Sequence, residues 1–186
     1  MASETGIDRE RENRRRLAVW GGVAAPMLLP LLALRAVDEA AWDPADLIFV
    51  AILLAGVGVA YELAARVTGR SAYRAAVGIA LASAFLGAWI NLAVGIIGSE
   101  DNPANLIYVG VLAVAAVGAG LARFRPLGMA RAMAAAAVAQ ALVFAVALAA
   151  GFGFTGPITV FFAALWLISA WLFRKAARQP GWQRPA

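Results

Sequence analysis

The stretch AAVGIALASAFLGAWINLAVGII, residues 75–97, contains no charged side chain. A transmembrane helix needs about 20 predominantly apolar residues, so this stretch is long enough to cross a bilayer. Five further stretches share its apolar character, and they lie near residues 17–36, 46–65, 105–122, 130–151 and 157–173. The sequence therefore predicts an all-α integral membrane protein of six transmembrane helices. The connecting breaks are short, which makes neighbouring helices antiparallel.

The composition agrees with a membrane location. Hydrophobic residues make up 63% of the 186 residues and charged residues 15%, whereas soluble chains average about 45–50% and about 25%. Six spans with short loops account for nearly the whole sequence. We expect residues 1–16 to form a basic cytoplasmic tail, residues 17–173 the membrane domain and residues 174–186 a second cytoplasmic tail.

The first apolar stretch admits a second interpretation. A basic flank before an apolar core is also typical of a cleaved signal peptide. Acidic residues precede this stretch, however, and no small-residue cleavage site comes before Asp38. We therefore expect residues 17–36 to be retained as the first transmembrane helix, with kinks at Pro26 and Pro30.

The basic residues indicate how the helices are oriented. If the loops alternate between two sides, every arginine and lysine except Arg35 falls on one side. Short basic loops of multi-spanning proteins stay in the cytoplasm. Both termini are thus predicted to be cytoplasmic, with turns at residues 37–45 and 98–104 on the outer face. This topology also accounts for the formal charge of +5, so no binding to nucleic acid is predicted.

An internal repeat is visible in the sequence. The segment DPADLIFV at residues 43–50 returns as NPANLIYV at residues 102–109, and GPIT at residues 156–159 is a fainter third copy. A repeat of this kind predicts tandem helical hairpins that all point in the same direction. The three predicted hairpins lie near residues 17–65, 75–122 and 130–173.

The repeated segment has the features of a helix start. In each copy a residue that can cap a helix precedes a proline, and a side-chain acceptor follows in the first turn. These positions are Asp43, Pro44 and Asp46 in the first copy, and Asn102, Pro103 and Asn105 in the second. A hard cation held by Asp38, Glu39, Asp43 and Asp46 is the alternative, but their spacing matches no established calcium loop. We interpret the segment as a structural turn and predict no metal site.

Few polar side chains lie within the predicted spans. Ser83 and Gln140 occupy equivalent positions in the repeat, and Asn91 lies two turns beyond Ser83. Small and polar residues also recur every three or four positions along the third span, at Ala76, Ala80, Ser83, Gly87, Asn91 and Gly95. Such a stripe lets helices approach closely. The alternative is that Ser83, Asn91 and Gln140 line a pocket or pathway.

Glu62 is the acidic residue that comes closest to the core of a predicted span. It lies near the cytoplasmic end of the second span, four residues before Arg66. An ion pair between the two side chains at the helix end is the simpler interpretation. The alternative is a carboxylate that binds a proton or a substrate.

The sequence contains no histidine and no cysteine. It therefore lacks the usual ligands of zinc, haem and iron–sulfur clusters, and it lacks the commonest general base. Because no carboxylate lies near the centre of a span, we predict no cofactor, no catalytic residue and no enzymatic activity.

The segment WINLAVGIIGSEDNPAN, residues 89–105, is distinctive. With its surroundings from Tyr73 to Gln140, it resembles a family of uncharacterised small bacterial multi-spanning inner-membrane proteins. The resemblance implies a location in the bacterial inner membrane and assigns no catalytic residues.

These observations leave two functional hypotheses. The first is a non-enzymatic protein that acts through helix–helix contacts in the lipid bilayer, as an accessory, scaffold or modulator subunit. Its partner would be another membrane protein or a second copy of the chain. The second is a small transporter or channel for a neutral or lipophilic solute of unspecified identity. We favour the first hypothesis, because the sequence shows separate polar patches and no continuous polar lining.

Overall fold

The computed structural model describes residues 44–68, 70–99 and 101–179, and helices are the only regular structure in these ranges. The helices are α2 (Pro44–Val67), α3 (Ser71–Ala93), α4 (Ile107–Leu121), α5 (Pro126–Ala149) and α6 (Gly156–Ala177), with a short 3₁₀ helix, η1 (Pro103–Leu106), before α4. The chain divides into two units, residues 1–49 and residues 50–186. The described part of the first unit is the start of α2. Helices α3 to α6 lie wholly in the second unit.

Four helical segments are long and apolar enough to cross a membrane. They are Ser71–Leu92, Pro103–Leu121, Pro126–Ala149 and Gly156–Ala177. The apolar part of α2, Leu54–Ala64, is shorter than a full span, and the predicted span 17–36 lies outside the described residues. The all-α prediction is thus confirmed for the described residues, and four of the six predicted spans are found. These four segments are typical of a membrane protein.

The structure corrects the predicted ends of two spans. The span predicted at residues 75–97 ends at Ala93, because Gly95 and Gly98 have φ values of 74° and 70° and turn the chain out of the helix. The span predicted at residues 130–151 begins earlier, at Pro126. Proline fits the first position of a helix, where no amide donor is needed.

Proline also lies at the start of three other helices. Pro44 is the first residue of α2, Pro103 is the first residue of η1, and Pro157 is the second residue of α6. The three proline turns of the sequence repeat are therefore helix starts. The relation of the hairpins as tandem copies stays a prediction.

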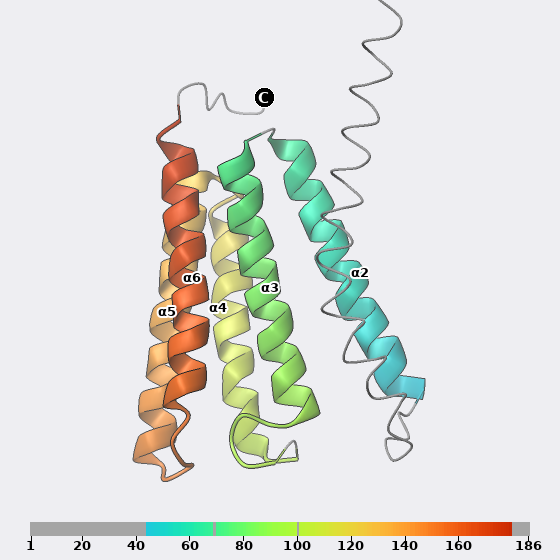
Figure 1. The fold of residues 1–186 in the computed structure, drawn as a ribbon, viewed down its shortest axis with the longest axis vertical. Coiled ribbons are helices and arrows are strands. Elements are labelled where there is room, and N and C mark those ends of the chain that lie inside the picture. Colours follow the sequence, from blue (N-terminus) through green and yellow to red (C-terminus); the bar gives the residue numbers. More distant parts are fainter. Residues whose placement is uncertain (1–43, 69, 100, 180–186) are drawn as a thin grey trace, which may run out of the picture. The chain divides into compact units, whose positions relative to one another are not determined.

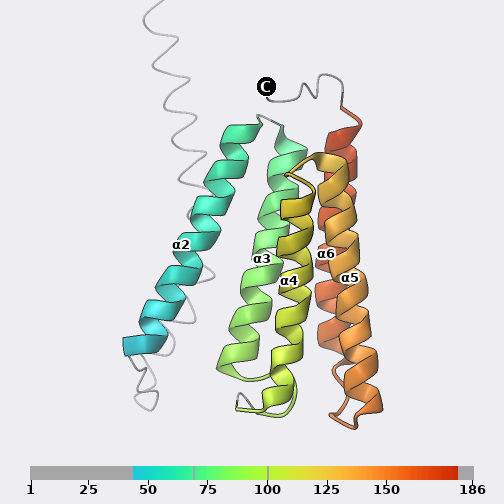
Figure 2. The ribbon, with the colours of Figure 1, turned by 180° about the vertical axis from the view of Figure 1, so that it is seen from behind.

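Helices α3 to α6 form an antiparallel bundle (Figures 1 and 2). Helix α6 packs against both α3 and α5, and α4 packs against α5, whereas α3 and α4 touch each other little. Large side chains fill the core. Phe162, Trp166 and Phe173 of α6 are buried, and the ring of Phe173 meets Tyr73 of α3 edge-on, with centroids 5.1 Å apart. Helices α5 and α6 thus form the centre of the bundle, with α4 packed on α5 and α3 packed on α6.

The stripe of small residues predicted along the third span faces α6. Ala76 and Ser83 are fully buried. A Cβ atom placed on Gly87 would lie 3.7 Å from the ring of Phe162, so the two helices meet closely there. Gly95 lies beyond the end of α3 and belongs to the following loop.

The contact between α4 and α5 depends on a glycine. A Cβ atom placed on Gly118 would lie 2.8 Å from the Cβ atom of Ala132, and 3.3 Å from its Cα atom. Real side chains do not approach that closely, so any larger residue at position 118 must move the two helices apart.

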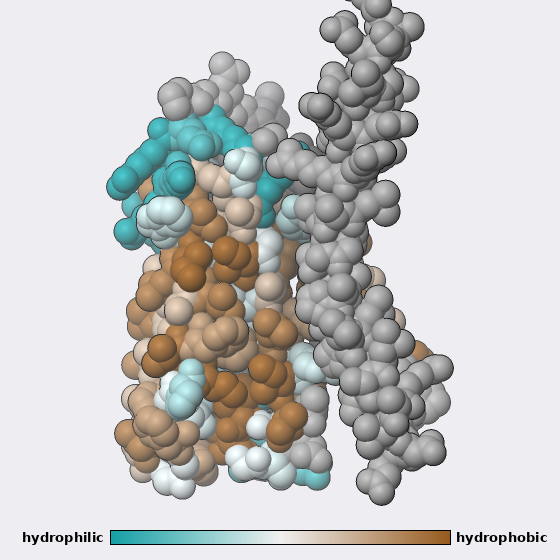
Figure 3. Space-filling model, in the orientation of Figure 1, coloured by the Kyte–Doolittle hydropathy of each residue, from teal (hydrophilic) through white to brown (hydrophobic). Residues whose placement is uncertain are grey.

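Hydrophilic residues gather at one end of the bundle, while the sides of the helices are hydrophobic on the face shown in Figure 3. We call this end, formed by the start of α3, the turn from α4 to α5 and the end of α6, the basic end. There, Nη1 of Arg70 donates hydrogen bonds of 3.1 Å to the carbonyl oxygens of Ala176 and Gln179. These bonds give the carbonyls at and just beyond the end of α6 a side-chain donor, where the helix itself offers few. We call the opposite end, with the turns after α3 and α5, the loop end.

Candidate functional site

The loop end contains a hydrogen-bond network centred on Asn105, whose side chain is 4% exposed. Its Oδ1 atom accepts hydrogen bonds from the amides of Ile96 (3.0 Å) and Ile97 (2.8 Å). Its Nδ2 atom donates to the carbonyl oxygens of Ser99 (2.7 Å) and Ile97 (3.4 Å). One buried asparagine therefore holds the loop that joins α3 to η1.

The two asparagines of the repeated turn act differently. Asn102 caps η1, because its Oδ1 atom accepts a hydrogen bond of 3.0 Å from the amide of Ala104. The sequence suggested that Asn105 accepts hydrogen bonds from the first amides of its own helix. Its side chain instead turns back and bonds to the preceding loop. The first copy cannot be compared side chain by side chain, since Asp43 and the side chains of Pro44 and Asp46 lie outside the described part.

Asn91 connects the end of α3 to the same network. Its Nδ2 atom donates a hydrogen bond of 3.1 Å to the carbonyl oxygen of Asn105. Its Oδ1 atom is buried and has no hydrogen-bond partner within the described residues. Asn91 therefore belongs to the loop end, two residues before α3 ends at Ala93.

Two buried serines bond to backbone carbonyls. Ser83, 1% exposed, donates a hydrogen bond of 2.8 Å to the carbonyl of Ile79 in its own helix. Ser169 of α6 donates one of 2.8 Å to the carbonyl of Ala76 in α3. The second bond crosses between helices and was missed by the sequence analysis. Helical periodicity could have found it, because Ser169 shares a face of α6 with the buried Phe162 and Trp166.

Gln140 is buried inside α5. Its side chain is 3% exposed, and its Nε2 atom has no hydrogen-bond partner among the residues that the structure describes. It also has no hydrogen bond to Ser83 or Asn91 in that part of the chain. The three polar positions singled out from the sequence therefore do not form one site.

Three further buried hydroxyl groups make no hydrogen bond of standard geometry within the described ranges, although those of Tyr108 and Thr155 lie close enough to interact with each other. They belong to Tyr108 near the start of α4, Thr155 just before α6 and Thr159 in its first turns. Buried polar atoms without partners are costly and are rare in folded proteins unless water or a ligand binds them. The loop end thus holds the polar atoms to which a small polar molecule could bind.

The predicted pair of Glu62 and Arg66 lies on α2. The Glu62 side chain interacts with another group in the structure. The side chain of Arg66 is not described, so the pairing of these two residues stays a prediction. The described residues contain no cluster of three or more acidic side chains that could hold a metal ion. The alternative cation site at Asp38 to Asp46 falls almost wholly outside them.

Comparison of the chain with protein-family models, curated proteins and solved structures finds no match. The resemblance of residues 89–105 to bacterial inner-membrane proteins therefore stays an expectation.

Proposed function

We propose that this chain is a non-enzymatic membrane protein that binds another transmembrane helix through the outer face of α4. That helix belongs to another membrane protein or to a second copy of the chain, and the protein acts as an accessory, scaffold or modulator subunit. The supporting observation is a row of small exposed residues on α4: Gly110, Ala113, Ala116 and Gly120. A Cβ atom placed on Gly110 or Gly120 would meet nothing within 4 Å.

The spacing of these residues supports a helix as the partner. Steps of three or four positions place them along one face of α4. Lipid tails pack as well against leucine as against glycine, whereas a second helix approaches closely only where side chains are small. The opposite side of α4 already uses Gly118 in this way against Ala132 of α5. The exposed row is therefore suited to a second contact of the same kind.

The interior of the bundle supports a structural role as well. Phe162, Trp166 and Phe173 fill the space between the helices. The buried hydroxyls of Ser83 and Ser169 donate their hydrogen bonds to backbone carbonyls. A packed interior of this kind leaves the outer surface as the part of the molecule that can bind a partner.

We further propose that the protein lies in the bacterial inner membrane with both termini in the cytoplasm. The support is the clustering of basic side chains at the basic end, which the positive-inside rule assigns to the cytoplasm. The basic residues of that end in the described ranges are Arg70, Arg74, Arg123, Arg125, Arg131, Arg174, Lys175 and Arg178.

Purification from native membranes tests the α4 contact. The double variant Ala116→Leu with Gly120→Leu adds bulk to the exposed row. The matched control, Ala135→Leu with Ala141→Leu, adds nearly the same bulk, one carbon less, to exposed positions of α5. We expect a copurifying protein, or the dimer of this chain, to be lost from the α4 variant and kept by the control. Equal retention by both variants would remove the support for α4 as the binding face.

The second candidate, a carrier of a neutral or lipophilic solute, is favoured by a different observation. Buried polar atoms without partners in the described residues occur on Asn91, Gln140 and Thr159, and the buried hydroxyls of Tyr108 and Thr155 have only each other nearby. Mass spectrometry of the purified protein tests this candidate. A stoichiometric small molecule retained through purification would favour it, and a protein that carries only lipid and detergent would not.

A further inference from the structure

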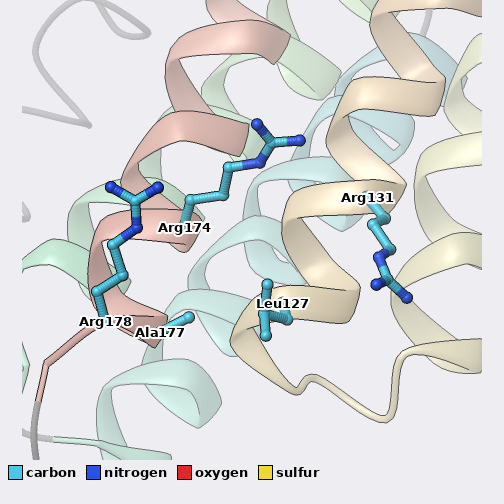
Figure 4. Close-up of a pocket in the computed structure, with 5 residues that line it drawn as sticks. All are labelled: Leu127, Arg131, Arg174, Ala177 and Arg178. Carbon is cyan, nitrogen blue, oxygen red and sulfur yellow. The ribbon is translucent and has the colours of Figure 1, made fainter.

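A basic pocket of about 300 Å³ lies between the start of α5 and the end of α6. Its lining residues are Leu127 and Arg131 of α5, and Arg174, Ala177 and Arg178 at the end of α6. Figure 4 shows Leu127 between the two helices, with Arg174 reaching from α6 toward α5 and Arg131 on the far side of Leu127. The pocket thus combines three cations with two apolar side chains.

The three guanidinium groups are not neutralised in the described part of the chain. No acidic residue lines the pocket, and the described residues offer none of the three guanidinium groups an ion pair or a hydrogen bond. Arg174 and Arg178 are four positions apart on one helix, where like charges repel and destabilise the helix. In Figure 4 the side chains of Arg174 and Arg178 extend to different sides of α6, so an anion held by both requires Arg178 to turn toward the pocket. Such an anion would offset the repulsion between the two charges.

The end of α6 does not need these arginines as capping groups. Arg70 already donates to the carbonyl oxygens of Ala176 and Gln179, which neutralises the negative end of the helix dipole. The start of α5 forms the other wall of the pocket. The amide groups of its first turn have no acceptor within the helix, and they point toward the basic end. The positive potential of the pocket therefore comes from the start of α5 and from the three arginines, while Arg70 offsets the negative end of α6.

The neighbouring side chains locate the pocket relative to the bilayer surface. Trp171 is 59% exposed, and Nζ of Lys175 lies 5.3 Å from the centre of its ring. An exposed tryptophan beside a lysine near a helix end is typical of the membrane–water interface. With a rise of about 1.5 Å per residue, Arg174 and Arg178 lie about 4.5 and 10.5 Å farther along α6. This range covers the headgroup layer, which is about 5–8 Å thick.

We propose that this pocket binds the phosphate group of an anionic phospholipid. Arg174 and Arg178 contact the phosphate oxygens, Arg131 contributes a third positive charge, and Leu127 and Ala177 contact the glycerol and the first methylene groups. Leu127 is 58% exposed at the basic end, so its side chain is available to contact lipid. The site is separate from the α4 face and requires no protein partner.

Lipid binding to the full-length purified protein tests the proposal. Wild-type protein in a neutral detergent is titrated with phosphatidylglycerol, phosphatidylcholine or soluble glycerol phosphate, and the rise in Tm and the lipid-bound mass are measured. The pocket variant is Arg131→Gln with Arg174→Gln and Arg178→Gln. The control, Arg123→Gln with Arg125→Gln and Lys175→Gln, removes the same charge from the same end but outside the pocket.

We expect phosphatidylglycerol to stabilise the wild-type protein and the control, and to bind the pocket variant at least about tenfold more weakly. Equal weakening in the pocket variant and the control would mean that surface charge alone attracts the lipid, and would overturn the proposal. Stabilisation by glycerol phosphate at the same concentrations would overturn the assignment to a lipid. If the triple variant does not fold, Leu127→Glu places an acid in the pocket at an exposed position. The proposal then requires that this variant lose phosphatidylglycerol binding.

Discussion

The hydroxyl of Ser169 on α6 donates a hydrogen bond of 2.8 Å to the carbonyl oxygen of Ala76 on α3, 93 positions away in the sequence. Ser83, which is just as deeply buried, donates a bond of the same length to Ile79 of its own helix. One serine thus joins two helices, and the other belongs to a single helix.

We expect Ser169→Ala to lower the free energy of unfolding by about 0.6 kcal/mol, and by no more than about 1.7 kcal/mol, as is found for hydrogen bonds between membrane helices. Ser83→Ala removes a bond that does not connect helices, so its effect should be close to zero. Reversible unfolding in mixed micelles measures both. An equal loss of stability in the two variants would contradict the assignment of the Ser169 bond as an interhelical contact.

Asn105→Ala should be the more damaging of two asparagine substitutions at the loop end. It leaves the amides of Ile96 and Ile97 without their acceptor, and each unsatisfied buried group costs about 1–3 kcal/mol. Asn102→Ala removes only a helix cap, at a cost of about 1 kcal/mol. Hydrogen exchange at the Ile96 and Ile97 amides provides a local readout. Protection that survives in Asn105→Ala would rule out this role for the side chain.

Gly118→Ala and Gly120→Ala, two substitutions on the same helix, should have opposite effects on the purified protein. The new methyl group at position 118 would collide with Ala132, and we expect a loss of about 1–3 kcal/mol from overpacking. At position 120 it meets nothing within 4 Å, and alanine forms helices better than glycine by about 1 kcal/mol. Adding Ala132→Gly to Gly118→Ala should restore stability. Failure of this rescue would mean that the contact has been misassigned.

Gln140→Leu separates the two candidate functions. Because Nε2 of Gln140 has no partner in the described structure, the substitution removes no hydrogen bond and should leave Tm unchanged or higher. Asn91→Leu loses the bond to Asn105 and should lower Tm slightly. A protein that acts through helix contacts keeps its partner in both variants. If both variants fold normally but lose a bound solute, the transporter hypothesis replaces the scaffold hypothesis.

Single cysteines test the proposed topology, because the chain has no cysteine of its own. Ser99 at the loop end and Leu127 at the basic end are both exposed. An impermeant thiol reagent should label Ser99→Cys in intact cells, and should label Leu127→Cys only after the membrane is opened. Labelling of Leu127→Cys in intact cells would reverse the orientation.

The helices and their starts could be predicted from the sequence, because both depend on local properties. Runs of apolar residues predict α3 to α6 to within four residues of their observed starts. Proline identifies the starts of η1 and α6 because its ring fits the first turn of a helix. The end of α3 was placed too far along the chain, since Gly95 and Gly98 resemble any other small residues until their positive φ values are seen.

The partners of the polar and small residues were decided only by the tertiary structure. Nothing local to Asn105 shows that its side chain turns back to the α3 loop, and nothing local to Ser169 points to Ala76. Gly118 and Gly120 are also indistinguishable in sequence, although one is covered by Ala132 and the other is open. The physical reason is that a hydrogen bond or a steric contact depends on which atom of another helix lies next to the side chain. The order of residues along one helix fixes which face a side chain occupies, but not what lies against that face.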